Sequence, residues 1–467
     1  MNECRAFNQK RGMRMHSKNV NMLEGSVVKG ILGLTVPIML MNVLQSMFNI
    51  IDSTVLKMFG NDGGTAIGAV GVCGVLITLI TCLVIGVSAG ANVAIAKHIG
   101  RKDPEAVERA VHTSIAFAAV GGVIVMVIGI LGAELFLTWM NCPKELLPQA
   151  ALYFRLYFAG VPIAAVYNFS AAILRASGDT RRPMMYSISG GVVKVVLTFA
   201  FTAFFKAGVV GVAMATIASW LLSATLALWK LTHTDTVVRL SFRKVRFHKM
   251  EMKQVLHVGI PAGLQQALYS IANVLIVTAV NASGPDASTG MSIANNYDNL
   301  MYQVSVAPSL AVMSYVSQNV GAGNIGRAQK SVRSGMLLTV CMGGTLGALS
   351  AIFSGPLASI MTDNPAVIMY AQQKMVLVSS TYFICGINEI LGASLRGLGK
   401  PTVPTASTLI FMCLLRLPWV WFIYPLVPGN LTFLYLIWPI GWILSLATEL
   451  CWYFPAIKKL RAQHATL

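Results

Sequence analysis

The chain has 467 residues, of which 55% are apolar and only 11% are charged. An ordinary soluble domain carries about 25% charged residues, and so few charges cannot keep this much apolar surface in solution. The composition therefore excludes a water-soluble enzyme, a disordered chain and a secreted disulfide scaffold. Because about 20 apolar residues cross a bilayer as one helix, we predict an all-α integral membrane protein with about 12 transmembrane helices.

Long runs without charged residues predict the transmembrane helices in chain order. Six are predicted near residues 30–56, 66–97, 108–132, 148–175, 183–206 and 209–231, and six more near 254–281, 287–319, 328–350, 365–396, 403–426 and 430–456. The predicted domains are an N-terminal segment (1–29), an N-lobe (30–231), a linker (232–253), a C-lobe (254–456) and a tail (457–467).

The net charge of +18 would suggest nucleic-acid binding in a soluble protein. Here most of the 35 Lys and Arg residues fall in the termini, the linker and the loops after every second helix. The positive-inside rule then places both termini in the cytoplasm of a multi-pass protein of the bacterial plasma membrane, with no nucleic-acid partner. Few basic residues fall on the opposite side: Lys57, Lys144, Arg155, Lys206 and Lys374.

The two halves of the chain repeat at an offset of about 220 residues. The pattern Pro-x8-Ser-x2-Asn occurs at 37–49 and again at 261–273, and Arg-x2-Gly-x4-Pro occurs at 175–183 and at 396–404. An even number of helices per copy gives both copies the same orientation in the membrane. The pattern therefore predicts a parallel internal repeat of two six-helix lobes, an arrangement that transporters use.

Several short motifs resemble those of bacterial MATE (multidrug and toxic compound extrusion) transporters, closest to the DinF-like branch. The motifs are NMLEG at 21–25, NIIDS at 49–53, LRASGDT at 174–180, QNVGAG at 318–323 and LRGLGKP at 395–401. The resemblance implies two six-helix lobes in a V-shape around a central cavity. It also implies export of organic cations in exchange for protons or sodium.

A charged side chain inside a bilayer is costly and is therefore a candidate functional residue. In the N-lobe, Gln45, Asn49 and Asp52 share one face of the first helix at spacings of four and three. A polar face beside an acid suits proton or cation binding, although Asp52 also fits a solvated helix end. Gln45 and Asn49 are predicted to line the substrate cavity. The resemblance places the key N-lobe acid at Asp52 and a polar family position at Asn168.

The fifth helix departs from the pattern of many MATE proteins, which carry Asn-x3-Asp there as part of a cation site. This chain has Lys194 and Thr198 at those positions. A fixed ammonium repels sodium, and Lys194 could instead pair with Asp52. We therefore favour protons over sodium as the coupling ion. A static counter-ion is the alternative role for Lys194.

The C-lobe offers further polar residues for a substrate cavity. Its first two helices carry Gln266 and Asn273, then Asp298 and Tyr302. Further along, Glu389, Arg416 and Glu449 are charged residues inside predicted helices. The internal repeat suggests an acid–base pair of Glu389 with Arg416, matching Asp52 with Lys194. Both pairs could be functional, or both could be buried structural ion pairs.

These observations favour a monomeric secondary antiporter that exports organic cations and uses no cofactor or metal. No Walker A sequence is present, so ATP is not expected to drive it. The alternative is a flippase for a lipid-linked oligosaccharide from the same wider superfamily, for which Lys194 and Arg416 would serve as anion contacts. An enzyme is not favoured, because the sequence has no metal-ligand cluster, nucleophile elbow or paired catalytic carboxylates.

Overall fold

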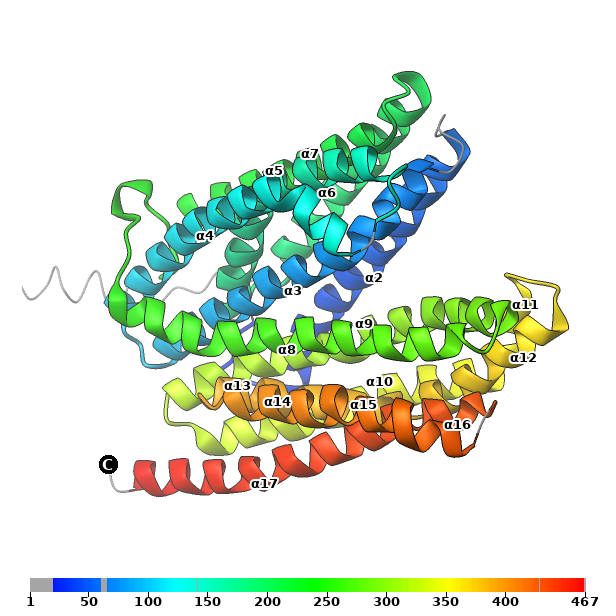
Figure 1. Ribbon diagram of the computed structural model, residues 1–467. Coiled ribbons are helices and arrows are strands. Elements are labelled where there is room, and N and C mark those ends of the chain that lie inside the picture. The colour runs from blue at the N-terminus through cyan, green and yellow to red at the C-terminus, as the bar shows by residue number, and fades with distance from the viewer. Residues whose placement is uncertain (1–19, 60–64, 141, 428, 466–467) are drawn as a thin grey trace, which may run out of the picture. The chain divides into compact units, whose positions relative to one another are not determined.

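The computed structural model describes residues 20–59, 65–140, 142–427 and 429–465, which form helices joined by short loops (Figure 1). Within these ranges no strand occurs. The predicted all-α class is therefore confirmed.

Each predicted transmembrane segment falls on one helix or on a run of consecutive helical elements. The first six segments correspond to α2 (Val27–Phe59), α3 (Thr65–Gly100), α4 (Pro104–Trp139), α5 (Leu147–Ala176), α6 (Arg181–Phe199) with the π-helical turn η1 (Ala200–Phe204), and α7 (Gly208–Thr232). The short 3₁₀ helix η2 (Phe242–Lys244) lies in the linker.

The second half contains more interrupted helices than the first. Its elements are α8 (Lys249–Asn281), α9 (Pro285–Gly321), α10 (Ile325–Ile352), α11 (Ser354–Ser359), α12 (Pro365–Lys374), η3 (Met375–Ser379), α13 (Tyr382–Gly397), α14 (Thr402–Ser407), η4 (Thr408–Leu414), α15 (Arg416–Pro418), η5 (Trp419–Ile423), η6 (Tyr424–Leu426), α16 (Leu431–Tyr435) and α17 (Ile437–Ala465).

Among the described residues, ten helices are long and apolar enough to cross a membrane by length and composition. An eleventh span is a pair bent by 44°, Pro365–Ser379 with Tyr382–Gly397. The remaining predicted segment lies in α9, which is 37 residues long but carries Asn295, Asn296, Asp298 and Asn299 in its middle. These polar side chains lower the hydropathy of a helix that is otherwise long enough to cross.

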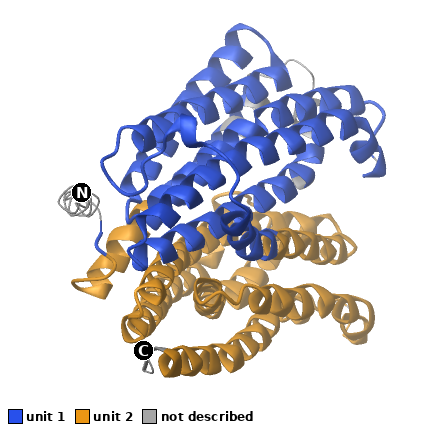
Figure 2. Cartoon of the chain, turned by 90° about the vertical axis from the view of Figure 1, so that its left-hand side faces the viewer, with its two compact units in different colours: residues 1–21, 40–263 blue, residues 22–39, 264–467 orange. Residues whose placement is uncertain are grey.

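The chain divides into two compact units, coloured separately in Figure 2. Unit 1 comprises Met1–Asn21 and Leu40–Gly263, and unit 2 comprises Met22–Met39 and Leu264–Leu467. The first of the three boundaries along the chain, between Asn21 and Met22, precedes α2. The other two fall inside a long helix, α2 or α8, and close to its internal proline, Pro37 or Pro261. Since proline removes a backbone hydrogen bond within a helix, these are places where a helix bends readily.

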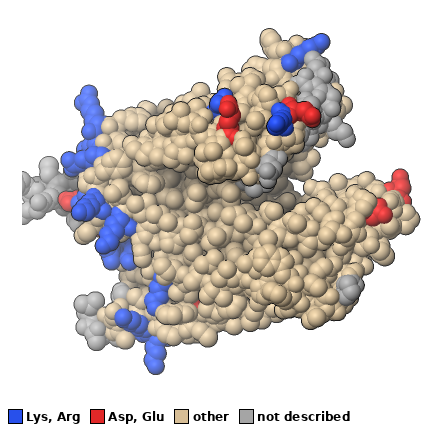
Figure 3. Space-filling model, viewed as in Figure 1, with Lys and Arg blue, Asp and Glu red and all other residues tan. Residues whose placement is uncertain are grey.

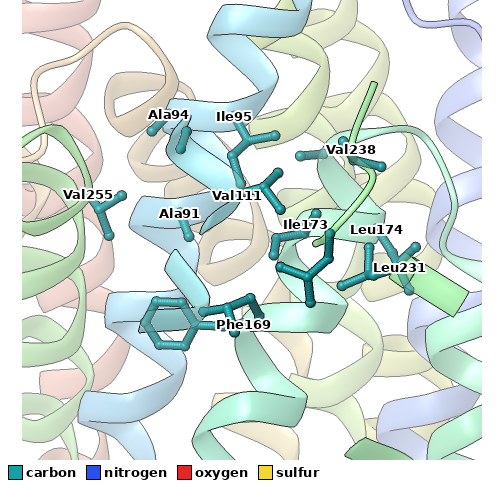
Figure 4. Packing of buried hydrophobic residues seen from close by; sticks show 14 of the residues in the cluster. Ala91, Ala94, Ile95, Val111, Phe169, Ile173, Leu174, Leu231, Val238 and Val255 are labelled. Carbon is teal, nitrogen blue, oxygen red and sulfur yellow. The ribbon is translucent and has the colours of Figure 1, made fainter. Parts of the chain in front are cut away.

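The core of unit 1 is built by α3, α4 and α5, whose facing residues are small or branched. Ile95, Val111 and Ile173 are buried where these three helices meet (Figure 4). Val238 of the linker and Val255 of α8 join the same cluster. The linker is thus anchored to unit 1 by buried apolar residues and does not form a free tether.

Polar contacts reinforce this anchoring of the linker. The backbone N–H of Ser241 donates to Nε2 of His112 at 3.0 Å. Close by, the buried carboxylate of Glu251, at the start of α8, accepts from Nε of Arg109 at 3.1 Å.

On the face shown in Figure 3, Lys and Arg side chains of unit 2 gather at one end of its helices, whereas those of unit 1 gather at one end but also lie near its middle and at its other end. In unit 1 this end includes Arg101, after α3, and Arg181, at the start of α6. In unit 2 it includes Arg327, at the start of α10, and Lys400, after α13, whereas Asp286 begins α9 at the other end.

Glycines bring α3 and the first part of α8 into close contact within unit 1. A Cβ on Gly86 would lie 2.1 Å from Cα of Gly263, and a Cβ on Gly90 would lie 2.1 Å from the carbonyl oxygen of Val255. Such close approach is typical of small-xxx-small packing in membranes.

We predict that Gly86→Ala destabilises the protein although alanine favours helices. The added methyl group meets backbone and forces the two helices apart, which costs about 1–3 kcal/mol. Gly74→Ala on the same helix is the control, since a Cβ there has no neighbour within 4 Å and should stabilise the helix slightly. Thermal unfolding in detergent measures both, and equal effects would contradict this packing.

Candidate functional site

In unit 1, α2 and α6 run side by side in the same direction. Nε2 of Gln45 donates to Oγ of Ser187 at 2.8 Å. One turn further along both helices, a Cβ on Gly191 would lie 2.0 Å from the Phe48 ring. The second contact lies one turn beyond the first on both helices. The same register therefore places residue 52 of α2 at the level of residues 194 and 195 of α6. The side chains of Asn49 and Asp52 lie outside the described residues.

The other predicted residues of this lobe lie on α5 and α6. Asn168 is half-buried, and its Nδ2 donates to the carbonyl oxygen of Ala164 in its own helix at 2.8 Å. Lys194 is half-buried on α6, and Thr198 is fully buried just before the π-helical turn η1. Neither Lys194 nor Thr198 is without an interaction partner.

In unit 2, Arg416 is buried against α8 and α17. Its Nη1 donates to Oδ1 of Asn273 at 2.7 Å. Its guanidinium carbon lies 5.4 Å from the centre of the Tyr269 ring and 5.5 Å from that of Trp438. Only 1% of this residue is exposed. Aromatic faces and an amide oxygen therefore replace the water that a guanidinium would otherwise bind.

The predicted pair of Glu389 with Arg416 is wrong. No carboxylate among the described residues forms an ion pair with Arg416. Glu389 instead lies within electrostatic reach of Arg396 on its own helix. The internal repeat identifies equivalent positions, but equivalent positions do not have to touch one another. The contact of Arg416 is with the first helix of its lobe.

A second buried cation of unit 2, Lys374, is held by Asp298. Nζ of Lys374 lies 2.8 Å from Oδ2 of Asp298, donates to Oδ1 of Asn295, and lies 5.2 Å from the centre of the Trp438 ring. Lys374 is 2% exposed, so it is buried within the predicted helix 365–396 and is not a solvated charge on the outer side. It ends α12, inside the bent pair of helices. Its isolation in the uncharged run 365–388 was the signal that could have identified it.

The remaining predicted cavity residues have less specific surroundings. Tyr302 is half-buried beside the aromatic core of unit 2. Gln266 is exposed, whereas its neighbour Gln265 is buried and accepts from Nη1 of Arg396 at 2.8 Å. Sequence reasoning selected Gln266 by its helical spacing and therefore missed this contact. Among the described residues, no group of three or more His, Cys, Asp or Glu could hold a metal ion.

We predict that breaking the Lys374–Asp298 pair is strongly destabilising. Lys374→Met leaves a buried carboxylate without its counter-ion, which costs about 3–5 kcal/mol. The control is Arg155→Met, which breaks the exposed pair of Arg155 with Glu134 and should cost no more than about 1 kcal/mol. Thermal unfolding in detergent compares the two. A similar loss in both variants would show that Lys374 is not held as the geometry indicates.

Comparisons with known proteins agree with the duplicated fold. The MatE family model matches the chain twice, at residues 37–200 and 261–422. The probable multidrug resistance protein YoeA of Bacillus subtilis is 26% identical over 385 residues, covering 80% of this chain and 82% of the relative. An FAD transporter of Shewanella oneidensis is 21% identical over 403 residues, covering 85% of this chain and 88% of the relative.

Solved structures share the fold. A crystal structure of MATE in the straight conformation has a TM-score of 0.89 at 21% identity and covers 96% of this chain and 100% of its own. The family match extends over both halves of the sequence and over most of its length. The chain belongs to the MATE family of membrane transporters.

Proposed function

We propose that this protein is a secondary antiporter that exports organic cations from a bacterial cell in exchange for protons. Its family membership supports transport, and the register of α2 and α6 supports the choice of ion. That register brings Lys194 level with Asp52, in the place where a bound sodium ion would need acidic or neutral oxygen ligands. This is the observation that carries the proposal.

The proposed chemistry is a competition for one carboxylate. In the resting state the ammonium of Lys194 pairs with Asp52, and Gln45, Asn49, Asn168 and Thr198 supply polar groups around them. A cationic substrate or a proton displaces Lys194 by binding to the acid or neutralising it. Since both use the same acid, binding of one disfavours binding of the other. Each shifts the conformational balance only by its difference in affinity for the two states.

The division of α2 and α8 between the units supports alternating access. Residues 22–39 belong to unit 2 although α2 continues into unit 1, and α8 passes from unit 1 to unit 2 after Gly263. Motion of one unit against the other therefore has to bend these two helices, each of which contains a proline. In this proposal Pro37 and Pro261 lie at the hinges.

The charge distribution supports an orientation and a location. The basic ends of the helices would face the cytoplasm, which places both termini there and the protein in the plasma membrane. We propose that it acts as a monomer, with the substrate path lined by Gln266, Asn273, Asp298, Tyr302, Glu389 and Arg416.

A second candidate substrate is an anionic aromatic molecule. Arg416 forms no ion pair with any described carboxylate and lies between two aromatic rings, and one relative is named an FAD transporter. The flippase alternative is not favoured, because the family model and the relatives that match are MATE proteins.

The test uses inside-out membrane vesicles that contain the full chain. Uptake of ethidium is followed by fluorescence under an imposed pH gradient and, separately, under a sodium gradient. We expect proton-driven uptake in the wild type and at least about a tenfold loss in Asp52→Asn, equivalent to about 1.4 kcal/mol. Glu134→Gln, at an exposed ion pair, is the control and should transport normally.

Other outcomes would change the proposal. Sodium-driven uptake, or unchanged proton-driven uptake in Asp52→Asn, would contradict the proposed coupling. Uptake of FAD in place of ethidium would favour the anionic substrate.

A further inference from the structure

Glu449 is a buried acid without a hydrogen bond in the middle of α17. It is 0% exposed, and neither carboxylate oxygen has a hydrogen-bond partner among the described residues. Oε1 points at Gly392 of α13: a Cβ built on that glycine would lie 3.4 Å from it. The absence of a side chain at 392 is therefore what makes room for this carboxyl group.

Two charged residues of α13 flank the carboxyl group. Glu389 precedes Gly392 by three residues and Arg396 follows it by four, so all three share one helix face. Both act electrostatically on Glu449. The Cβ position of Gly392 is also 3.8 Å from Nη1 of Arg396. Glu449 thus lies between an acid on one side and a base on the other.

Arg396 does not hydrogen-bond to either acid. Its Nη1 donates to Oε1 of Gln265 on α8 at 2.8 Å. The guanidinium is therefore close to Glu449 but is held by a neutral amide.

Few other titratable groups face the two acids. Cys385 of α13 and Tyr269 of α8 are within electrostatic reach of Glu389. Arg333 of α10 acts on Tyr453, one turn beyond Glu449. Asp298 of α9 lies near Tyr382. Within the described part of the chain, Asp298 does not lie near Glu389 or Glu449. Helix α14 has no ionisable residue. Within the described part of the chain, Arg396 is thus the base that acts on both acids.

An unpaired carboxylate without hydrogen bonds is unstable in an apolar interior, so the neutral form is favoured. Two neighbouring carboxyl groups also resist ionising together and titrate as a pair. Glu389 is half-buried, whereas Glu449 has no exposed surface. A proton can therefore reach Glu449 by way of Glu389.

We propose that Glu449, with Glu389 beside it, forms a second proton-binding site, and that loss of the proton on Glu449 draws Arg396 from Gln265 to Glu449. The proposal rests on the proposed function, to which it adds a site in unit 2. The proton leaves to water by way of Glu389, Glu449 becomes a carboxylate, and Arg396 exchanges its amide acceptor for that carboxylate. No covalent bond other than the O–H bond breaks.

The exchange would affect α8 near the boundary between the two units, where Gln265 lies. Gln265 lies two residues beyond Gly263, where α8 passes from unit 1 into unit 2, and four residues beyond Pro261. Release of Gln265 by Arg396 frees α8 from α13 at this junction. The proton on the acid pair would thereby control how firmly unit 2 holds the helix that it shares with unit 1.

Infrared difference spectroscopy of the purified full-length protein tests the site without any substrate. The wild type, taken from mildly acidic to mildly alkaline buffer, should lose a protonated carboxyl band of Glu449, distinct from any band of Asp52. Glu449→Gln should remove that band, whereas Glu389→Gln should keep it with its midpoint moved to lower pH, because a neighbouring negative charge is lost. Asp52→Asn and Glu134→Gln are the controls and should retain it. Retention of the band in Glu449→Gln, or its loss in Glu389→Gln, would overturn the proposal.

A second variant tests the role of Arg396. Gln265→Leu removes the competing acceptor, so Arg396 is free to stabilise the deprotonated pair. The midpoint of the band should move to lower pH by about one unit, a tenfold change in proton affinity. An unchanged midpoint, or a shift to higher pH, would contradict the exchange. These readouts do not depend on ethidium transport, so a failure of the proposed function is seen separately in the vesicle assay.

Discussion

The cost of placing charge inside an apolar helical bundle is the constraint that organises this protein. A charge in the membrane interior costs at least about 3 kcal/mol unless it is paired or solvated. Unit 2 meets that cost in three ways: Lys374 pairs with Asp298, Arg416 is covered by aromatic rings and Asn273, and Glu449 lies beside Glu389 without a hydrogen bond. The first two arrangements give a buried charge a partner. Glu449 has no hydrogen-bond partner, so it would be an unpaired carboxylate unless a proton is bound.

The internal duplication relates the positions of the interior charges in the two units, some of which correspond and some of which do not. Asn49 and Asn273 are equivalent positions, and Lys194 and Arg416 are equivalent within a residue or two. The observed bond from Arg416 to Asn273 therefore agrees with the α2–α6 register, which brings Lys194 to the same stretch of α2. The equivalent of Asp52, however, is Ile276, which is fully buried. Unit 2 thus has a base near the equivalent position and carries its interior acids on α9, α13 and α17.

Sequence alone could predict the helices, the repeat and the family, because uncharged runs and motif spacing are local properties. It could not predict the division of α2 and α8 between units, since that depends on packing between distant segments. The predicted Glu389–Arg416 pair failed because the repeat relates positions and carries no information on which way a side chain points. Lys374 fell within a predicted helix, but a count of charges on each side of the membrane carries no information on its partner, Asp298.

We propose that fixed charges within each unit exchange partners during transport, and reversal of the Asp52–Lys194 pair tests this most directly. Ethidium transport would be measured in vesicles for Asp52→Lys, Lys194→Asp and the double variant. We expect each single reversal to abolish transport, because two like charges then face each other, and the double variant to recover part of it. Normal transport in either single variant, or no recovery in a folded double variant, would contradict the pairing.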